Sequence, residues 1–229
     1  MTVAAGESPA AMPQPLPPRS RRIALQIEYD GRAFAGWQSQ AHAPSIQATL
    51  QAALARIADA PVALICAGRT DAGVHARAQI AHFDTRAQRS PDAWVLGANT
   101  LLPPDISLAW ARTVPAHFHA RYSALWRTYR YFILNRRARS ALAAGRALRV
   151  SAPLSVERMR EAGAWLVGEH DFSAFRAAEC QSRSPVRILR ALMVERAGDW
   201  LHIDITANAF LHTWRAIWSA CSWPSARDG

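Results

Sequence analysis

An alternation of apolar and polar residues runs through residues 22–29 and predicts a β-strand with one buried face. The next segment, 45–58, carries apolar residues three or four positions apart, which is the period of a helix, and Ser45 is placed to cap its first turn. The same criteria predict a buried strand at 61–67, strands at 78–85, 106–114 and 125–134, and a helix at 90–102. The order strand, helix, strand, strand, helix, strand resembles a split βαβ unit, an open sheet with helices on one face.

The chain as a whole divides by composition into five segments. Proline-rich residues at the start predict a disordered arm, and a stretch rich in arginine and alanine predicts a linker between two subdomains. The second subdomain is expected to hold a helix at 155–168 and strands at 187–196 and 200–208. The segments are an arm at 1–21, an N-terminal subdomain at 22–135, a linker at 136–149, a C-terminal subdomain at 150–212 and a tail at 213–229. We therefore expect an α+β fold.

The overall composition restricts the class of protein. Half of the residues are hydrophobic, which predicts a folded core, and a net charge of +10 points to polyanions, chiefly nucleic acid, or to an anionic membrane surface. The cysteines, Cys66, Cys180 and Cys221, are odd in number and far apart, which argues against a disulfide framework or a zinc cage. No apolar run approaches the roughly 20 residues of a membrane span, and no secretory signal is evident. We expect a cytoplasmic protein that does not use a membrane.

The segment CAGRTDAGVHA, residues 66–76, follows an apolar run and presents Asp71 just before a glycine turn. On the residues alone, two interpretations are open. Asp, Thr and Gly are ordinary turn residues, because Asp hydrogen-bonds nearby amides and Gly accepts positive φ. The other interpretation is that the turn displays Asp71 as a functional carboxylate.

Arginines and aromatic residues interleave in the strand expected at 125–134. Alternation places Arg127 and Tyr129 on one face of this strand and Arg130 on the other. Such a surface suits RNA, whose bases stack and whose phosphates pair, but a partly buried strand with arginines at its rim has the same pattern. The histidines His75, His117 and His119 lack the spacing of metal ligands, and we expect them to have structural or hydrogen-bonding roles.

Six blocks of the sequence resemble, in order and spacing, the bacterial tRNA pseudouridine synthase A family. They are EYDGRAFAGWQSQ, SIQATL, CAGRTDAGVHA, FHARYSALWRTYRY, GEHDFSAF and ANAFLH, and they extend over residues 22–212. The resemblance implies the pseudouridine synthase fold, in which two ferredoxin-like or RRM-like subdomains share one mixed, mainly antiparallel sheet with flanking helices. It also implies a homodimer without cofactor or metal that isomerises uridine to pseudouridine at positions 38 to 40, in the anticodon stem-loop of tRNA.

The resemblance also assigns residues to roles. Asp71 matches the family's nucleophile, and Arg69 matches the arginine beside it, which holds RNA or fills the space of the target base. Tyr129 matches the tyrosine that stacks on the target uracil. Further candidate RNA contacts are Arg121, Arg127 and Arg130. A single carboxylate can suffice because the leaving base is kept and rejoined through carbon, whereas glycosidases use a second carboxyl group to protonate the leaving group and deliver water.

Two other function classes remain open. The first is a protein that binds tRNA without isomerising it, and the second is a hydrolase that uses Asp71 with a bound metal. Release of tritium from carbon 5 of uracil distinguishes the synthase from the binder. Insensitivity to EDTA distinguishes either of them from the metal-dependent hydrolase.

The end of the chain departs from the family. After ANAFLH the family continues with a second histidine, MVRNIVG and a helix, whereas this chain reads TWRAIWSACSWPSARDG. Restoring one cytosine in a CAC-CAC repeat at His212 turns the following residues into His-His-Met-Ala-Arg-Asn-Leu and, further on, Val-Gly-Leu-Leu-Met-Ala. We therefore hypothesise a single-base deletion or a sequencing error at this codon. The arginine that the family pairs with its nucleophile then corresponds to Ala216.

We predict that the 229-residue product is poorly soluble and essentially inactive, because loss of the family's last helix and strand uncovers part of the core. The frame-restored chain, which carries the missing base, is expected to be an active dimer. Resequencing the gene across the codon for His212 tests the deletion. Turnover by the purified short chain at the rate of the frame-restored chain would contradict the expected loss of activity.

Overall fold

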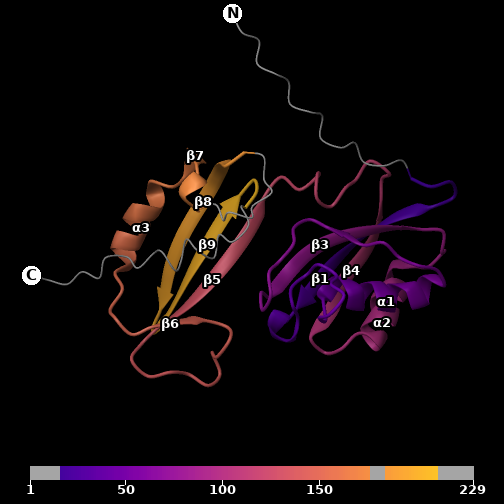
Figure 1. The fold of residues 1–229 in the computed structure, drawn as a ribbon. Coiled ribbons are helices and arrows are strands. Elements are labelled where there is room, and N and C mark those ends of the chain that lie inside the picture. Colours follow the sequence, from indigo (N-terminus) through magenta and orange to yellow (C-terminus); the bar gives the residue numbers. More distant parts are fainter. Residues whose placement is uncertain (1–15, 176–183, 211–229) are drawn as a thin grey trace, which may run out of the picture. The chain divides into compact units, whose positions relative to one another are not determined.

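The computed structural model describes residues 16–175 and 184–210, and the chain forms two compact units, unit 1 up to Ala124 and unit 2 from Leu125 (Figure 1). Each unit has its own sheet and its own hydrophobic core. Most of the arm expected at 1–21 and all of the tail expected at 213–229 lie outside the described residues.

Unit 1 consists of a four-stranded antiparallel sheet and two helices, α1 and α2, that pack beside each other (Figure 1). Its elements are β1 Arg21–Tyr29, α1 Ile46–Ala58, β2 Ile65–Cys66, β3 Ala76–Thr85, α2 Pro91–Leu101 and β4 Ile106–Val114. The strands lie in the order β2-β3-β1-β4, so β1 has a neighbour on both sides. The predicted split βαβ arrangement is confirmed.

Local sequence explains where the two helices begin. The Ser45 hydroxyl accepts a hydrogen bond from the amide of Ala48, and the Ser90 hydroxyl accepts one from the amide of Ala93. Pro91 is the first residue of α2, a position where no amide hydrogen is needed. The apolar stripes of both helices then enter the core, which includes Ile46, Leu50, Leu54, Trp94, Ala98, Leu25, Ile27 and Phe83. The prediction of both helices is confirmed.

The buried strand predicted at 61–67 is wrong in its length and in its burial. Only Ile65 and Cys66 pair with β3, and β2 lies at the edge of the sheet. Burial alternates along this segment, since Leu64 and Cys66 are buried whereas Ile65 is 42% exposed. An edge strand has a neighbour on one side only, so an apolar run there does not require burial on both faces.

Unit 2 consists of a five-stranded sheet in the order β6-β5-β9-β8-β7 and, among the described residues, one α-helix. The pairing of β5 with β6 is parallel, and the other pairings are antiparallel. Val156 and Met159 of the helix share a core with Leu201 and Ile203. The elements are β5 Arg127–Asn135, β6 Leu148–Val150, α3 Val156–Ala164, β7 Gly168–Asp171, β8 Val186–Ala197 and β9 Trp200–Ala207.

Two short strands of unit 2, β6 and β7, were not predicted. With 3 and 4 residues they are too short to show a recognisable period. The helix predicted at 155–168 is also too long, because α3 ends at Ala164 and Gly168, with a φ of +119°, already begins β7. The predicted strands at 187–196 and 200–208 are confirmed as β8 and β9.

The division between the units differs from the expected boundary at 135. The strand β5, which was expected to close the first subdomain, pairs with β9 from Arg127 opposite Ala207 to Leu134 opposite Trp200. The described strands also form two sheets where the resemblance implied one shared sheet. A local period predicts that a strand exists but not which distant segment it pairs with, so the sequence did not reveal that β5 belongs to unit 2. The α+β class of the fold is confirmed.

Candidate functional site

The Asp71 loop, residues 66–76, joins β2 to β3 in unit 1 and lies against the loop formed by residues 30–37 after β1. The Trp37 amide donates a hydrogen bond to the Thr70 carbonyl at 2.9 Å, and the Gly73 amide donates one to the Phe34 carbonyl at 3.3 Å. Inside the loop, the Val74 amide donates to the Asp71 carbonyl at 3.2 Å. The backbone on both sides of Asp71 is therefore fixed, while its side chain is partly exposed.

Two buried side chains of the sheet, Tyr29 on β1 and Gln79 on β3, form hydrogen bonds with this loop. The Tyr29 hydroxyl lies 2.8 Å from the Thr70 hydroxyl, and the Gln79 side-chain amide donates to the Gly68 carbonyl at 2.6 Å. Gln79 also donates to the Tyr29 hydroxyl at 3.4 Å, which links the two supports. Burial raises the pKa of Tyr29, so its phenol is neutral and can take part in both hydrogen bonds. These neutral contacts position Gly68 and Thr70, the residues on either side of Arg69. Thr70 also immediately precedes Asp71.

Two glycines allow the loops to touch. A Cβ atom at Gly31 would overlap the carbonyl oxygen of Val74. A Cβ atom at Gly36 would lie 2.7 Å from the Thr70 carbonyl oxygen, and Gly36 also has a φ of +97°. Both positions therefore require glycine because the backbone of the Asp71 loop lies directly against them.

A charged cluster closes the other end of the Asp71 loop. The Asp30 carboxylate accepts hydrogen bonds from the Arg32 guanidinium at 2.7–3.1 Å, and it lies 3.1 Å from Nδ1 of His75. The hydrogen bonds from Arg32 hold the pKa of Asp30 well below its usual value. This cluster ties the end of β1 to the residue just before β3.

The positive charges of Arg69 and Arg121 act on the Cys66 thiol, at the start of the Asp71 loop. Burial raises the pKa of the Cys66 thiol to about 11, and the positive charges of Arg69 and Arg121 oppose that shift. Both guanidinium groups are thus close enough to Cys66 to affect its ionisation, and both arginines are exposed. Arg121 belongs to the 115–123 loop, which follows β4. Arg69 is part of the Asp71 loop, Arg121 is part of the 115–123 loop, and both remain candidate RNA contacts.

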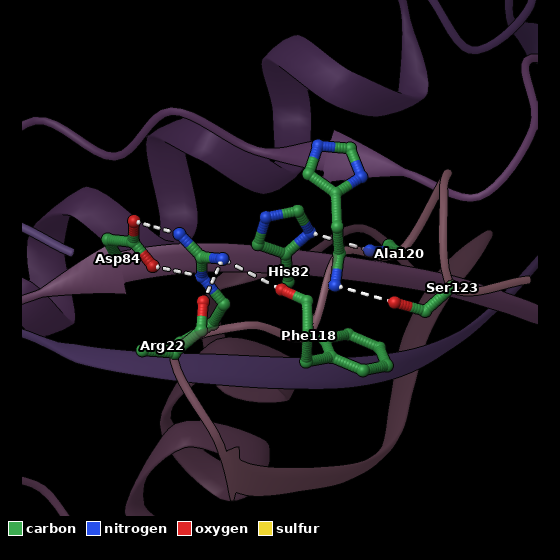
Figure 2. A network of polar contacts seen from close by, with 8 residues as sticks. Arg22, His82, Asp84, Phe118, Ala120 and Ser123 are labelled. Carbon is green, nitrogen blue, oxygen red and sulfur yellow. Dashed lines mark hydrogen bonds and ion pairs between the residues drawn. The ribbon is translucent and has the colours of Figure 1, made fainter. Parts of the chain in front are cut away.

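Two histidines hold the backbone of the 115–123 loop, and the contact of His82 with Ala120 is drawn in Figure 2. Nδ1 of His82 accepts a hydrogen bond from the Ala120 amide at 3.1 Å, and Nδ1 of His119 accepts from the amides of Arg121 and Tyr122, each at 3.2 Å. Burial lowers the pKa of His82 to about 4, with a further decrease caused by Arg22. A neutral imidazole can present Nδ1 as an acceptor, and these contacts confirm a hydrogen-bonding role for His119.

The remaining candidates lie on β5 in unit 2. The Tyr129 ring lies 4.5 Å from that of Phe210. The Arg127 guanidinium donates to the Asn208 carbonyl at 2.7 Å, and Arg130 pairs with Asp204, with Nε 2.6 Å from a carboxylate oxygen. These contacts favour the interpretation of Arg130 as a structural residue at the rim of a sheet. As RNA contacts, Tyr129, Arg127 and Arg130 remain predictions.

The part of the chain that the structure describes contains no group of three or more His, Cys, Asp or Glu side chains that could hold a metal ion. In that same part, no helix is long and apolar enough to cross a membrane.

Sequence reasoning missed the residues that support the Asp71 loop. Tyr29, Gly31 and Gly36 lie in the block EYDGRAFAGWQSQ, which the resemblance included without giving any of them a role. Gln79 lies in an alternating strand, and a polar residue at a buried position of that strand is the signal that could have identified it.

Comparison with known proteins identifies one family. The chain matches the family described as tRNA pseudouridine synthase over residues 25–123 and 162–220, and the second stretch extends beyond His212. It is 59% identical over 191 residues to tRNA pseudouridine synthase A of Methylococcus capsulatus, and this match covers 83% of this chain and 70% of that protein. The protein of the same name from Nitrosococcus oceani is 58% identical, with coverage of 83% and 74%, and that from Pseudoalteromonas atlantica is 51% identical, with coverage of 83% and 73%.

We predict that Gly36→Ala lowers the free energy of unfolding by about 1–2 kcal/mol more than Gly73→Ala does. Gly73 is the matched control, because it also has a positive φ, +75°, but a Cβ atom there meets no atom within 4 Å. Urea unfolding of the two variants gives the difference. Equal losses would show that the contact between Gly36 and Thr70 does not constrain the loop.

A second prediction concerns pH. The folded chain keeps His82 neutral down to about pH 4, whereas the usual pKa is 6.5, so the unfolded state binds more protons between these values. The free energy of unfolding therefore falls as the pH is lowered through this window. In His82→Asn, which keeps an acceptor oxygen but cannot titrate, we expect this loss to be about 3 kcal/mol smaller between pH 7 and pH 4.

Urea unfolding at a series of pH values measures this difference. The charged or titratable groups around His82 are Arg22, His119 and Asp84, and all three are retained in the variant. His42→Asn, which changes an exposed histidine, serves as the control. Parallel pH profiles for the wild-type chain and His82→Asn would contradict the prediction.

Proposed function

Since the chain belongs to the tRNA pseudouridine synthase family, we propose that it converts uridine to pseudouridine in tRNA and that Asp71 is the carboxylate that catalyses this reaction. The observation that carries the assignment of Asp71 is the construction of its loop. The residues around Asp71 are fixed by the amide of Trp37, the hydroxyl of Tyr29 and the side chain of Gln79. An ordinary surface turn does not need supports that reach from a buried strand.

The reaction itself makes modest demands on the protein. The bond between N1 of uracil and the ribose breaks, the base turns, a bond forms from carbon 5 to the ribose, and the hydrogen of carbon 5 is released as a proton while N1 takes one up. Asp71 can attack the ribose, attack the base or remove a proton in a glycal route, and each of these uses a single ionised carboxylate. Because the base is retained, no water has to be delivered, in contrast to glycoside hydrolysis.

The other roles follow the same proposal. Tyr129 stacks on the target uracil, and Arg69 holds RNA or occupies the space of the displaced base. Stacking contributes about 1–3 kcal/mol per base, which is similar to the few kcal/mol needed to extrude a nucleotide from its stack. The net charge of +10 supports binding to tRNA phosphates. We further propose that the substrate site is positions 38 to 40 in the anticodon stem-loop, that the protein acts in the cytoplasm and that it forms a homodimer.

A tRNA-binding protein without activity is the second candidate, and the departure of the sequence after His212 is the observation that favours it. The family relationship favours the synthase over this binder and over the metal-dependent hydrolase. Tritium release from tRNA labelled at carbon 5 of uracil, measured for the 229-residue chain and for the frame-restored chain, separates the synthase from the binder. Release by the frame-restored chain alone assigns the chemistry to the fold and the defect to the tail.

We predict that Asp71→Asn abolishes tritium release and leaves tRNA affinity and the urea unfolding midpoint close to their wild-type values. Asn is as good a turn residue as Asp, so the loop should keep its shape while losing its carboxylate. The measurement uses whichever chain is active in the preceding assay, with binding and unfolding as controls. Tritium release by Asp71→Asn at more than a small fraction of the parent rate would remove Asp71 from the mechanism.

A further inference from the structure

Arg22 has more hydrogen-bond partners than a structural ion pair requires. It is only 3% exposed, and its guanidinium pairs with the carboxylate of Asp84 on the neighbouring strand β3 at 2.7 Å and 2.8 Å (Figure 2). Nη1 of the same guanidinium donates to the carbonyls of Ala116 and Phe118, each at 2.7 Å. These carbonyls belong to the 115–123 loop, so one buried cation connects the sheet to that loop.

Hydrogen bonds continue along the loop up to Arg121. The amides of Ala120, Arg121 and Tyr122 all donate to histidine nitrogens, and the Ser123 amide donates to the His119 carbonyl at 2.8 Å. The rings of His82 and His119 lie 4.8 Å apart, and the His119 ring stacks on Tyr122 at 4.2 Å. The backbone at Arg121 is therefore fixed on both sides while its side chain remains exposed.

We propose that Arg22 is a positioning residue that, together with His82, holds the 115–123 loop so that the exposed Arg121 is directed to RNA phosphate. The proposal rests on tRNA being the substrate. Arg21, the neighbour of Arg22 on β1, is exposed, and its guanidinium donates to the Gln88 side chain at 3.0 Å, so it provides a comparison at almost the same place in the sheet.

The physical advantage of this arrangement is entropic. A phosphate contact from a mobile loop requires both the backbone and the side chain to become ordered on binding, which lowers affinity. Here the backbone is already ordered by the carbonyl contacts of Arg22 and the imidazole acceptors. Arg121 then has only its side chain to immobilise when it meets a phosphate, and its planar guanidinium is suited to that partner.

The test is a double-mutant cycle on the affinity for an unmodified tRNA transcript. In Arg22→Lys the ammonium keeps a positive charge opposite Asp84, but it has no planar fork to reach the carboxylate and both carbonyls together. We expect Arg22→Lys and Arg121→Gln each to weaken binding about 10-fold, and the double variant to bind about as Arg121→Gln does. If the double variant instead loses affinity by the product of the two single losses, Arg22 does not act through Arg121 and the proposal is overturned.

Three controls separate positioning from general destabilisation. Arg21→Lys should leave the affinity unchanged. His82→Asn, which keeps an acceptor for the Ala120 amide, should bind tRNA as the wild type does, whereas His82→Leu should lose affinity as Arg22→Lys does. The reverse order of the two His82 variants would contradict the proposal even if Arg22→Lys failed to fold.

Amide hydrogen exchange provides a measurement that does not depend on tRNA. Exchange at residues 120–122 should be at least about 10-fold faster in Arg22→Lys than in the wild type, with the amides of α1 unchanged. Unchanged exchange in the loop would overturn the role of Arg22 whatever the binding data show. A further outcome is that the wild-type chain binds no tRNA while exchange in Arg22→Lys accelerates as expected. The assignment of tRNA as the substrate then fails, whereas the role of Arg22 in holding the 115–123 loop is supported.

Discussion

The hydrogen bond between the hydroxyls of Tyr29 and Thr70 connects the sheet of unit 1 to the loop that carries Asp71, the proposed nucleophile. Tyr29 ends β1, one of the two interior strands of the sheet, and it is 3% exposed. Thr70 immediately precedes Asp71, and its carbonyl accepts from Trp37 while its hydroxyl contacts Tyr29 at 2.8 Å. The position of the candidate nucleophile is therefore set by the centre of a sheet, although Asp71 itself lies in a loop.

In unit 1, neutral hydrogen bonds hold the Asp71 loop, whereas ion pairs fix the segments next to it. The supports under the Asp71 loop are backbone amides, a phenol, a hydroxyl and a carboxamide, which give geometry without bringing a full charge under the loop. Charged pairs fix the neighbouring segments, with Arg32 on Asp30 after β1 and Arg22 on Asp84 between β1 and β3. A buried polar group costs about 1–3 kcal/mol when it loses its partner, so the buried contacts of Tyr29, Gln79 and Arg22 resist displacement of the loops that they hold.

The sequence predicted the elements that are defined locally and missed those that depend on distant partners. The helix at 46–58 has its own period and its own cap, and the strands at 186–197 and 200–207 are rich in residues typical of strands. By contrast, the pairing of β5 with β9 joins residues such as Arg130 and Asp204 that are 74 positions apart. Because of this distance, the sequence of the strand alone did not reveal the carboxylate of Asp204 that Arg130 binds.

The candidate site shows the same division between chemistry and geometry. The resemblance singled out Asp71 as the candidate nucleophile because it extends over several blocks. The need for Gly36 could not be predicted, because the carbonyl of Thr70 that excludes a side chain there belongs to another loop. In catalysis by a single carboxylate, the placement of that group carries much of the rate, and a displacement of about 1 Å can cost about 100-fold. A loop built in this way therefore gains more from close backbone contact, with glycine at the contact points, than it loses in the conformational entropy of those glycines.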